Sequence, residues 1–207
     1  MRASSRDRCR LAVVALGIAL ICITTPTLAL TAEYMVYGNG TAYQATVDLA
    51  GSENYAFTEP GILGERVPIQ VSAVTLTTET GASQSFNWSG SSEITFPSGN
   101  YTVNYTAPMR DNHLVILYDR IYQARIVLPE GYDIRNPLLG YVSPGANVIE
   151  KGNQVIIAWN ATRSIEVRYY DPERESLLYM FGNFWVIIAV VLLMPFLLTM
   201  RRTKRLE

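Results

Sequence analysis

Apolar and polar residues alternate along most of the middle of the chain, as they do in strands with one buried face. In residues 43–49 every second side chain is apolar: Tyr43, Ala45, Val47 and Leu49. A similar alternation over residues 67–73 changes phase before Val74, which predicts a β-bulge at that point. These segments therefore predict half-buried strands.

Residues 94–107 predict two strands joined by a turn. Ile94 and Phe96 lead into Pro97-Ser98-Gly99, a turn-like sequence, so we expect a hairpin with a glycine-containing loop. In the second strand the two faces differ in chemistry. One face carries Asn100, Thr102, Asn104 and Thr106, and the other carries Tyr101, Val103, Tyr105 and Ala107. We expect the aromatic face to lie in the core and the Asn/Thr face to meet solvent.

The rest of the middle segment repeats this organisation. Further strands are predicted at residues 114–118, 123–128, 155–159 and 164–170, separated by turn sequences such as Ser143-Pro144-Gly145. Between residues 33 and 175 we find no helical periodicity. Frequent short strands predict an all-β fold, an antiparallel β-sandwich over residues 33–172. A seam at residues 107–112 leaves two small subdomains as an alternative.

A long uncharged stretch near the C-terminus predicts a transmembrane α-helix. Residues 177–200 contain no charged side chain, enough for about 36 Å of helix, and we place the span at residues 179–200. Residues 173–178 are then a juxtamembrane linker, and residues 201–207 are a cytoplasmic basic tail. Aromatic residues at the start of the span predict an outer interface belt: Tyr179, Phe181, Phe184 and Trp185. Basic residues predict a cytoplasmic stop: Arg201, Arg202, Lys204 and Arg205.

Residues 1–32 have the features of a secretory signal. A basic opening precedes the apolar run Leu11–Ile23, Pro26 follows, and Ala29 and Ala32 are small residues suited to cleavage. The alternative is an uncleaved N-terminal anchor. Both interpretations deliver the chain after residue 32 to the outside of the membrane.

Charge is distributed unevenly along the 207 residues. The net charge is −1, but residues 1–10 and 201–207 each carry +3, and the remaining chain carries −7. This acidic middle argues against nucleic acid as a partner, because such a domain needs basic residues clustered on its fold. The two cysteines, Cys9 and Cys22, precede residue 30, so no disulfide is expected in the β domain.

The last 80 or so residues resemble a family of uncharacterised archaeal membrane-anchored surface proteins, a domain of unknown function. The resemblance rests on four short segments: Val127–Tyr132, Asn136–Gly140, Trp159–Thr162 and Arg168–Asp171, followed by the final span. It implies a signal sequence, a β-rich outer part and one C-terminal helix. It implies no active site.

Five N-x-[ST] triplets lie outside the membrane segments and are candidate glycosylation sites, at Asn39, Asn87, Asn100, Asn104 and Asn160. An alternative explanation is that strands are rich in Thr and turns are rich in Asn, which raises the number of chance matches. We favour real glycosylation on an extracytoplasmic cell-surface glycoprotein.

The sequence shows no catalytic constellation. His113 is the only histidine and we find no nucleophile motif, so we expect an exposed turn residue; no metal site or cofactor is expected either. Asp171, Glu173 and Glu175 read as a solvated acidic linker. The thirteen tyrosines form either a binding platform or the core.

The function that we expect is that of a single-pass, membrane-anchored binding or structural module of the cell envelope, and not an enzyme. Its expected partners are the lipid membrane and another envelope or membrane protein. The alternatives are an accessory subunit of a membrane complex, whose span packs on a larger machine through Gly182 and the Pro195 kink, and an extracytoplasmic hydrolase using His113 or surface carboxylates.

Overall fold

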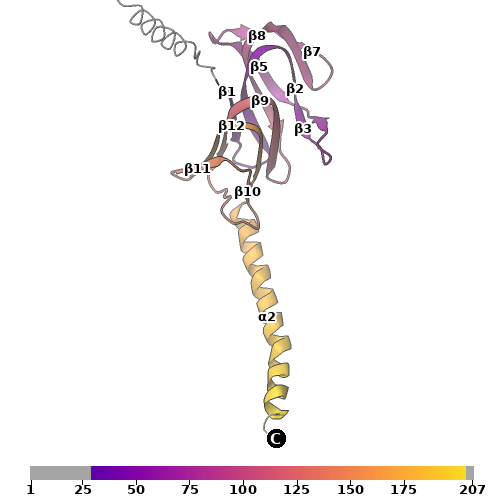
Figure 1. The fold of residues 1–207 in the computed structure, drawn as a ribbon, viewed down its shortest axis with the longest axis vertical. Helices are drawn as coiled ribbons and strands as arrows, with labels where there is room; N and C mark the ends of the chain where they lie inside the picture. The colour runs from indigo at the N-terminus through magenta and orange to yellow at the C-terminus, as the bar shows by residue number, and fades with distance from the viewer. Residues whose placement is uncertain (1–28, 204–207) are drawn as a thin grey trace, which may run out of the picture.

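The computed structural model describes residues 29–203, with side chains described as far as residue 195. The predicted leader before Ala29, with its two cysteines, lies outside the described residues, as do Lys204 and Arg205. The described chain forms a β domain from which a single C-terminal helix projects (Figure 1). The prediction of a mostly β protein with one apolar helix is confirmed.

Ten strands form one sheet. Their order is β10 (Tyr141–Val142), β12 (Gln154–Arg168), β9 (His113–Leu128), β1 (Leu30–Val36), β2 (Ala42–Ala56), β8 (Glu93–Pro108), β5 (Ser72–Thr78) and β6 (Ser83–Gln84), with β11 (Ala146–Lys151) on β12 and β7 (Asn87–Trp88) on β8. A separate two-stranded sheet contains β3 (Thr58–Pro60) and β4 (Arg66–Pro68). The main sheet is thus continuous, where the sequence suggested two separate sheets, and it includes strands from both sides of the predicted seam at residues 107–112.

The prediction of a purely antiparallel arrangement is wrong at one pair of strands. β1 pairs antiparallel with β2 on one side and parallel with β9 on the other, in a register that joins Leu30 to Tyr122 and Met35 to Val127. Parallel neighbours need a long connection between them, and here it comprises everything from β2 to β8. The sheet is therefore mixed, with β1 in its middle.

The predicted hairpin at Pro97–Gly99 is also wrong, because β8 runs without a turn from Glu93 to Pro108. Opposite this point the pairing with β2 shifts register between Leu49 and Asn54, and Gly51 has a positive φ of 59°. A bulge tolerates the proline that a regular ladder would exclude. Pro97-Ser98-Gly99 therefore bends a strand in place of ending it.

Two other pairs of predicted strands are single long strands. The strand β9 contains both residues 114–118 and residues 123–128, and β12 contains both residues 155–159 and residues 164–168. The two long strands pair with each other, and their register shifts after Trp159. The bulge predicted before Val74 is confirmed by a register shift between Ser72 and Thr75. The strand predicted at residues 67–73 is wrong, since β4 ends at Pro68 and β5 begins at Ser72.

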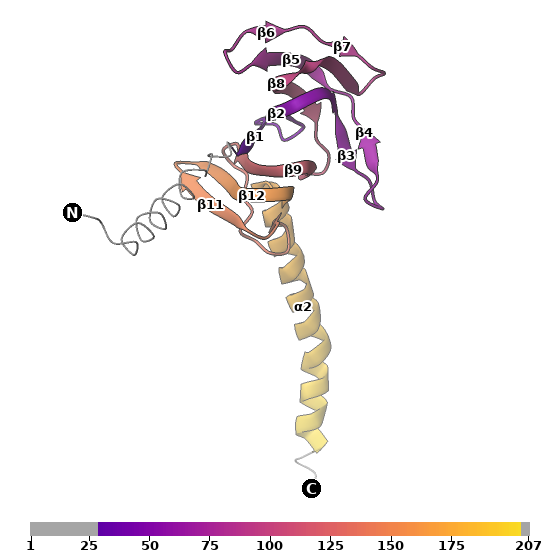
Figure 2. The same cartoon turned by 45° about the horizontal axis from the view of Figure 1, so that its top comes forward.

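The predicted alternation of buried and exposed residues is confirmed in the strands that form the core. Along β8, Tyr101, Val103, Tyr105 and Ala107 are buried, and the intervening Asn and Thr residues face outward. β2, β5 and β8 lie on one side of β1, and β9, β11 and β12 lie on the other, with the β3–β4 hairpin at one flank (Figure 2). One hydrophobic core joins residues from both halves.

The helix α2 spans Pro172–Thr203 and begins with strong local signals. The Asp171 Oδ1 accepts a hydrogen bond from the Arg174 amide at 2.8 Å, which caps the helix, and Pro172 occupies the first helical position. Glu173 and Glu175 in the first turn favour the positive end of the helix dipole. Residues 173–178, predicted as a linker, are thus the first turns of the helix.

Candidate functional site

The junction between the β domain and α2 is short and firmly held. Tyr170, which is 2% exposed, exchanges two backbone hydrogen bonds with Asp133, and its hydroxyl accepts one from the Asn136 amide at 3.0 Å. Tyr169 is fully buried and packs edge-to-face on Tyr132. Only Asp171 separates these buried residues from the first helical residue. The β domain therefore continues into the helix through a single residue.

Within the described residues, α2 is long and apolar enough to cross a membrane, and none of its apolar window is buried in protein. Its 32 residues correspond to about 48 Å. The predicted belt residues lie at the start of this apolar stretch with their side chains exposed: Tyr179, Phe181, Phe184 and Trp185. Residues 179–185 cover about 9 Å of helix axis, a suitable depth for an interfacial layer. Arg201 and Arg202, two residues of the predicted cytoplasmic stop, fall in the last turn of α2.

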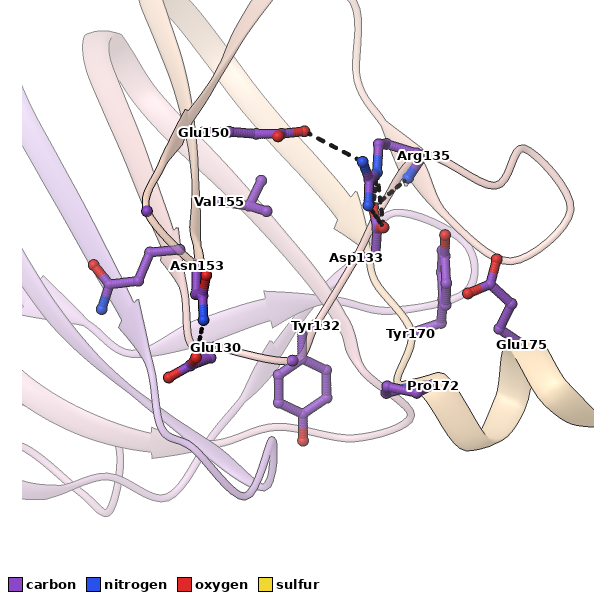
Figure 3. A pocket seen from close by; sticks show the side chains of 13 residues that line it. Glu130, Tyr132, Asp133, Arg135, Glu150, Asn153, Val155, Tyr170, Pro172 and Glu175 are labelled. Carbon is purple, nitrogen blue, oxygen red and sulfur yellow. Dashed lines mark hydrogen bonds and ion pairs between the residues drawn. The ribbon is translucent and has the colours of Figure 1, made fainter.

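A cavity of about 470 Å³ lies beside the junction, and we call it the helix-proximal pocket. Its walls come from the β9–β10 connection, the β11–β12 turn and the start of α2 (Figure 3). The residues that line it are Glu130, Gly131, Tyr132, Asp133, Arg135, Glu150, Gly152, Asn153, Gln154, Val155, Tyr170, Pro172 and Glu175. The pocket thus lies where the β domain meets the start of α2.

Arg135 organises one wall of the helix-proximal pocket. Its Nε lies 2.8 Å from Asp133 Oδ2, and its Nη1 lies 3.7 Å from Glu150 Oε1 (Figure 3). Hydrogen bonds from the Arg135 side chain lower the pKa of Asp133, with a further contribution from the Ile134 and Arg135 amides. On the opposite wall Asn153 donates a hydrogen bond to Glu130.

The helix-proximal pocket is acidic, but most of its charged side chains already form hydrogen bonds or ion pairs with other residues of the protein. Four carboxylates line it against one guanidinium, and Glu175 also belongs to the first turn of α2. Among the described residues, no group of three or more His, Cys, Asp or Glu side chains is arranged to hold a metal ion. We therefore interpret this pocket as part of the junction.

A second cavity, of about 340 Å³, lies on the inner face of the sheet, and we call it the tyrosine cavity. Strands β2, β8 and β9 and the β3–β4 hairpin provide its walls: Val47, Leu49, Ala50, Ser52, Asn54, Tyr55, Ala56, Thr58, Arg66, Tyr105, Ile116, Leu117, Tyr118, Asp119, Arg120 and Tyr122. Tyr118 and Tyr122 stack at 4.6 Å between ring centroids, and Tyr55 and Tyr105 lie 6.1 Å apart. The sequence left open whether the tyrosines form a core or a platform; most of the described tyrosines belong to the core, and four of them also line this cavity.

Burial keeps these phenols neutral. It raises the pKa of Tyr122 to about 12, with a smaller effect from neighbouring Tyr55, and it raises the pKa of Tyr55 and Tyr105 as well. The Tyr122 hydroxyl donates to the Asp48 carbonyl at 2.8 Å. The cavity therefore offers neutral hydroxyl groups, and Tyr122, whose proton is already donated to Asp48, can still accept a hydrogen bond.

The predicted glycosylation sites lie in two environments. Asn39, Asn87, Asn100 and Asn160 are exposed. Asn104 is half-buried in the middle of the sheet, where its Oδ1 accepts a hydrogen bond from Thr46 Oγ1 at 2.7 Å. Asn100 Nδ2 donates to Glu79 at 2.9 Å. The Asn/Thr face predicted from the alternation is thus confirmed as the outer face of β8.

His113 is the first residue of β9 and is not a turn residue. Its Nε2 lies 3.0 Å from Glu166 Oε1 on β12, and both side chains are about one-third exposed. This contact joins two paired strands at the edge of the domain. It lines neither the helix-proximal pocket nor the tyrosine cavity.

Comparison with protein-family models matches residues 28–207, which include the whole β domain and α2. The chain belongs to DUF5803, a family of unknown function. A search of curated proteins found no match. The DUF5803 match begins one residue before the first described residue and covers the β domain and helix together. The resemblance to an uncharacterised family is therefore confirmed over more of the chain than the segments that suggested it.

Proposed function

We propose that this DUF5803 protein is a single-span cell-surface glycoprotein of an archaeal envelope, whose extracytoplasmic β domain is a binding module and not an enzyme. In this proposal α2 crosses the membrane with its arginine-rich end in the cytoplasm. The N-terminal segment acts as the signal that exports the domain. The two halves of the bent sheet then serve as the two layers of a sandwich.

This proposal rests mainly on how the β domain continues into α2. Buried, hydrogen-bonded residues lead directly into an apolar helix whose side chains are not buried within the described chain. Apolar side chains such as Phe184 and Trp185 are more than half exposed around this helix, and in water that exposure is unfavourable at about 25 cal/mol per Å² of apolar surface. A lipid bilayer removes this cost. The basic residues at the far end of the helix favour the cytoplasmic side.

Cysteine labelling on intact cells tests the orientation. In a background with Cys9 and Cys22 changed to serine, Thr80→Cys in the exposed β5–β6 turn reports on the β domain and Thr203→Cys reports on the tail. We expect a membrane-impermeant maleimide to label the first variant on intact cells and the second only after permeabilisation. The reverse pattern would overturn the proposed topology.

Replacing the span tests whether the protein acts as a surface module or as a subunit held through its helix. Residues 179–200 would be exchanged for an unrelated apolar helix, with the aromatic belt restored. We expect partners that co-purify in mild detergent to remain, because the β domain makes the contacts. Loss of all partners on exchange would favour the accessory-subunit alternative.

A further inference from the structure

The tyrosine cavity has the placement of a ligand site. It is lined by residues of β2, β8 and β9, beside the register shift in β2, and by residues of the β3–β4 hairpin. That hairpin stands at one flank of the sheet (Figure 2). Its volume of about 340 Å³ is at the lower end of the range for small-molecule sites. The occupant would therefore be of the size of a single ring.

The mouth of the cavity is spanned by contacts between different elements. Arg66 on β4 forms an ion pair with Asp119 on β9, which ties the hairpin to the sheet. Arg120 Nη1 donates to the Ala50 carbonyl at 2.7 Å, next to the bulge in β2. Both arginines are thus already engaged by protein groups and do not point to a charged ligand.

Two hydroxyl groups at this site lack partners. The Tyr118 hydroxyl and the hydroxyl of Tyr34 behind it are buried and find no hydrogen-bond partner among the described residues. The two hydroxyls lie close together, and the contact between them raises the pKa of Tyr34 and lowers that of Tyr118, in each case after the dominant raising effect of burial. Even a hydrogen bond between the two would leave one of their O–H donors without an acceptor. A buried hydroxyl without a partner is unfavourable, so a molecule that supplies the missing partner would gain affinity.

The geometry points to the tyrosine cavity as a binding site for a neutral, hydroxyl-rich molecule of sugar-ring size. Aromatic rings offer flat apolar faces to the ring, and the phenolic hydroxyls donate to and accept from its hydroxyl groups. This inference deepens the proposed binding function by naming its ligand class. It does not depend on which side of the membrane the β domain occupies.

Other ligand classes fit the cavity less well. A quaternary ammonium ion makes no hydrogen bonds and would leave the Tyr118 hydroxyl without a partner. An anion or a primary ammonium ion would be buried without a free opposite charge, which is strongly unfavourable. A hydrocarbon would supply no hydrogen-bond partner to the Tyr118 hydroxyl.

Ligand-observed saturation-transfer NMR on the full-length protein in phosphatidylglycerol nanodiscs tests the inference. The probes are D-glucose, D-mannose and N-acetyl-D-glucosamine, with choline and inorganic phosphate as charged comparators. We expect saturation transfer to at least one sugar, a lack of measurable choline binding, and unchanged phosphorus line widths for phosphate. Binding of a charged comparator without any sugar, or binding of none of the five probes, would overturn the inference.

Variants connect the signal to the cavity. Tyr118→Phe removes one unpartnered hydroxyl and should weaken the sugar that binds by about five- to tenfold, while leaving thermal stability unchanged or raised. Tyr141→Phe makes the same chemical change on β10, away from the cavity, and should bind as the wild type does. Ser52→Trp should abolish binding by filling the mouth. Equal affinity for wild type, Tyr118→Phe and Ser52→Trp would place the sugar elsewhere and overturn the inference, whatever the topology experiment shows.

Discussion

At the scale of single residues, Asp133 is the group that holds the wall of the helix-proximal pocket. Its Oδ1 accepts hydrogen bonds from the Ile134 and Arg135 amides, and its backbone pairs with Tyr170 just before the helix. The carboxylate is mostly buried, whereas its partner Arg135 is 72% exposed. The Arg135 side chain makes the largest contribution to the lowered pKa of Asp133, and the amides add to it. Because Arg135 is exposed, its pair with Asp133 contributes little to stability beyond these hydrogen bonds.

Replacing this carboxylate should have a pH-dependent effect. The pKa of Asp133 is lowered in the folded protein from its ordinary value of 3.8, so the charge contributes stability above that pH and loses it as the pH falls further. We expect Asp133→Asn to lower the free energy of unfolding at pH 7 by about 1 kcal/mol, with a smaller difference at pH 3. Chemical denaturation at both pH values measures this.

Asp111→Asn is the matched control for that experiment, since Asp111 is exposed in the turn before β9 and lines neither cavity. It should leave the stability difference between the two pH values as in the wild type. An Asp133→Asn variant with the same loss at pH 3 as at pH 7 would contradict the electrostatic explanation.

Glycan occupancy should follow exposure of the acceptor side chain. We expect glycans at Asn39, Asn87 and Asn160, which are exposed, and none at Asn104, which is half-buried and bonded to Thr46. Asn100 should show partial occupancy, because its amide nitrogen is bonded to Glu79. Glycopeptide mass spectrometry on protein from its native source measures each site, and full occupancy at Asn104 would contradict this ranking.

At the scale of elements, the sequence predicted the positions of strands better than their lengths. Alternation located residues 43–49 and 101–107 correctly because each face of β2 and β8 has a constant environment. It did not predict that Pro97–Gly99 continues a strand, because turns and bulges use the same residues, Gly, Pro and Ser. The parallel pairing of β1 with β9 joins residues about ninety positions apart and leaves no local pattern.

For a related reason, neither cavity could be predicted from the sequence. Alternation shows that Tyr105 faces inward, but the same alternation fits a filled core and an internal space equally well. The start of α2 did carry a signal, since Asp171 followed by Pro172 and Glu173 is typical of a capped helix. Because these residues precede a predicted membrane span, the same acidic residues also fit a solvated linker.

The one-residue junction should fix the direction of the β domain relative to α2. In protein lacking Cys9 and Cys22, spin labels at Thr80→Cys and Ser176→Cys should give a narrow distribution of label-to-label distances by pulsed electron paramagnetic resonance. Inserting Gly-Ser between Tyr170 and Asp171 should broaden it, because the buried tyrosines would no longer lead directly into the capped first turn. The same insertion after Gly38, in the exposed β1–β2 loop, is the control; equal widths in all three proteins would contradict a stiff junction.

At the scale of the whole molecule, the tyrosines make the fold sensitive to alkali. Burial raises the pKa of Tyr34, Tyr43, Tyr55, Tyr105, Tyr118 and Tyr122, among others. A phenol that binds its proton more tightly in the folded state stabilises that state below about pH 10, and this contribution is lost as the pH rises towards the folded pKa.

Tyrosinate absorbance followed from pH 8 to pH 13 should therefore rise in two steps. Tyrosines outside the buried group should ionise in the first step, and the buried group should ionise together with unfolding, recorded by circular dichroism on the same samples. In denaturant all thirteen should titrate in one step near pH 10. A single step for the folded protein would contradict the buried cluster.

The central position of β1 has a consequence for how the protein is made. β1 is the first described strand, yet one of its two neighbours, β9, follows it only after some eighty further residues, so the middle of the sheet closes late as the chain is made. If a peptidase removes the leader after Ala29, β1 remains whole, whereas a cut after Ala32 would shorten it by three paired residues. Under the proposed export, leader removal and sheet closure would therefore act on adjoining residues.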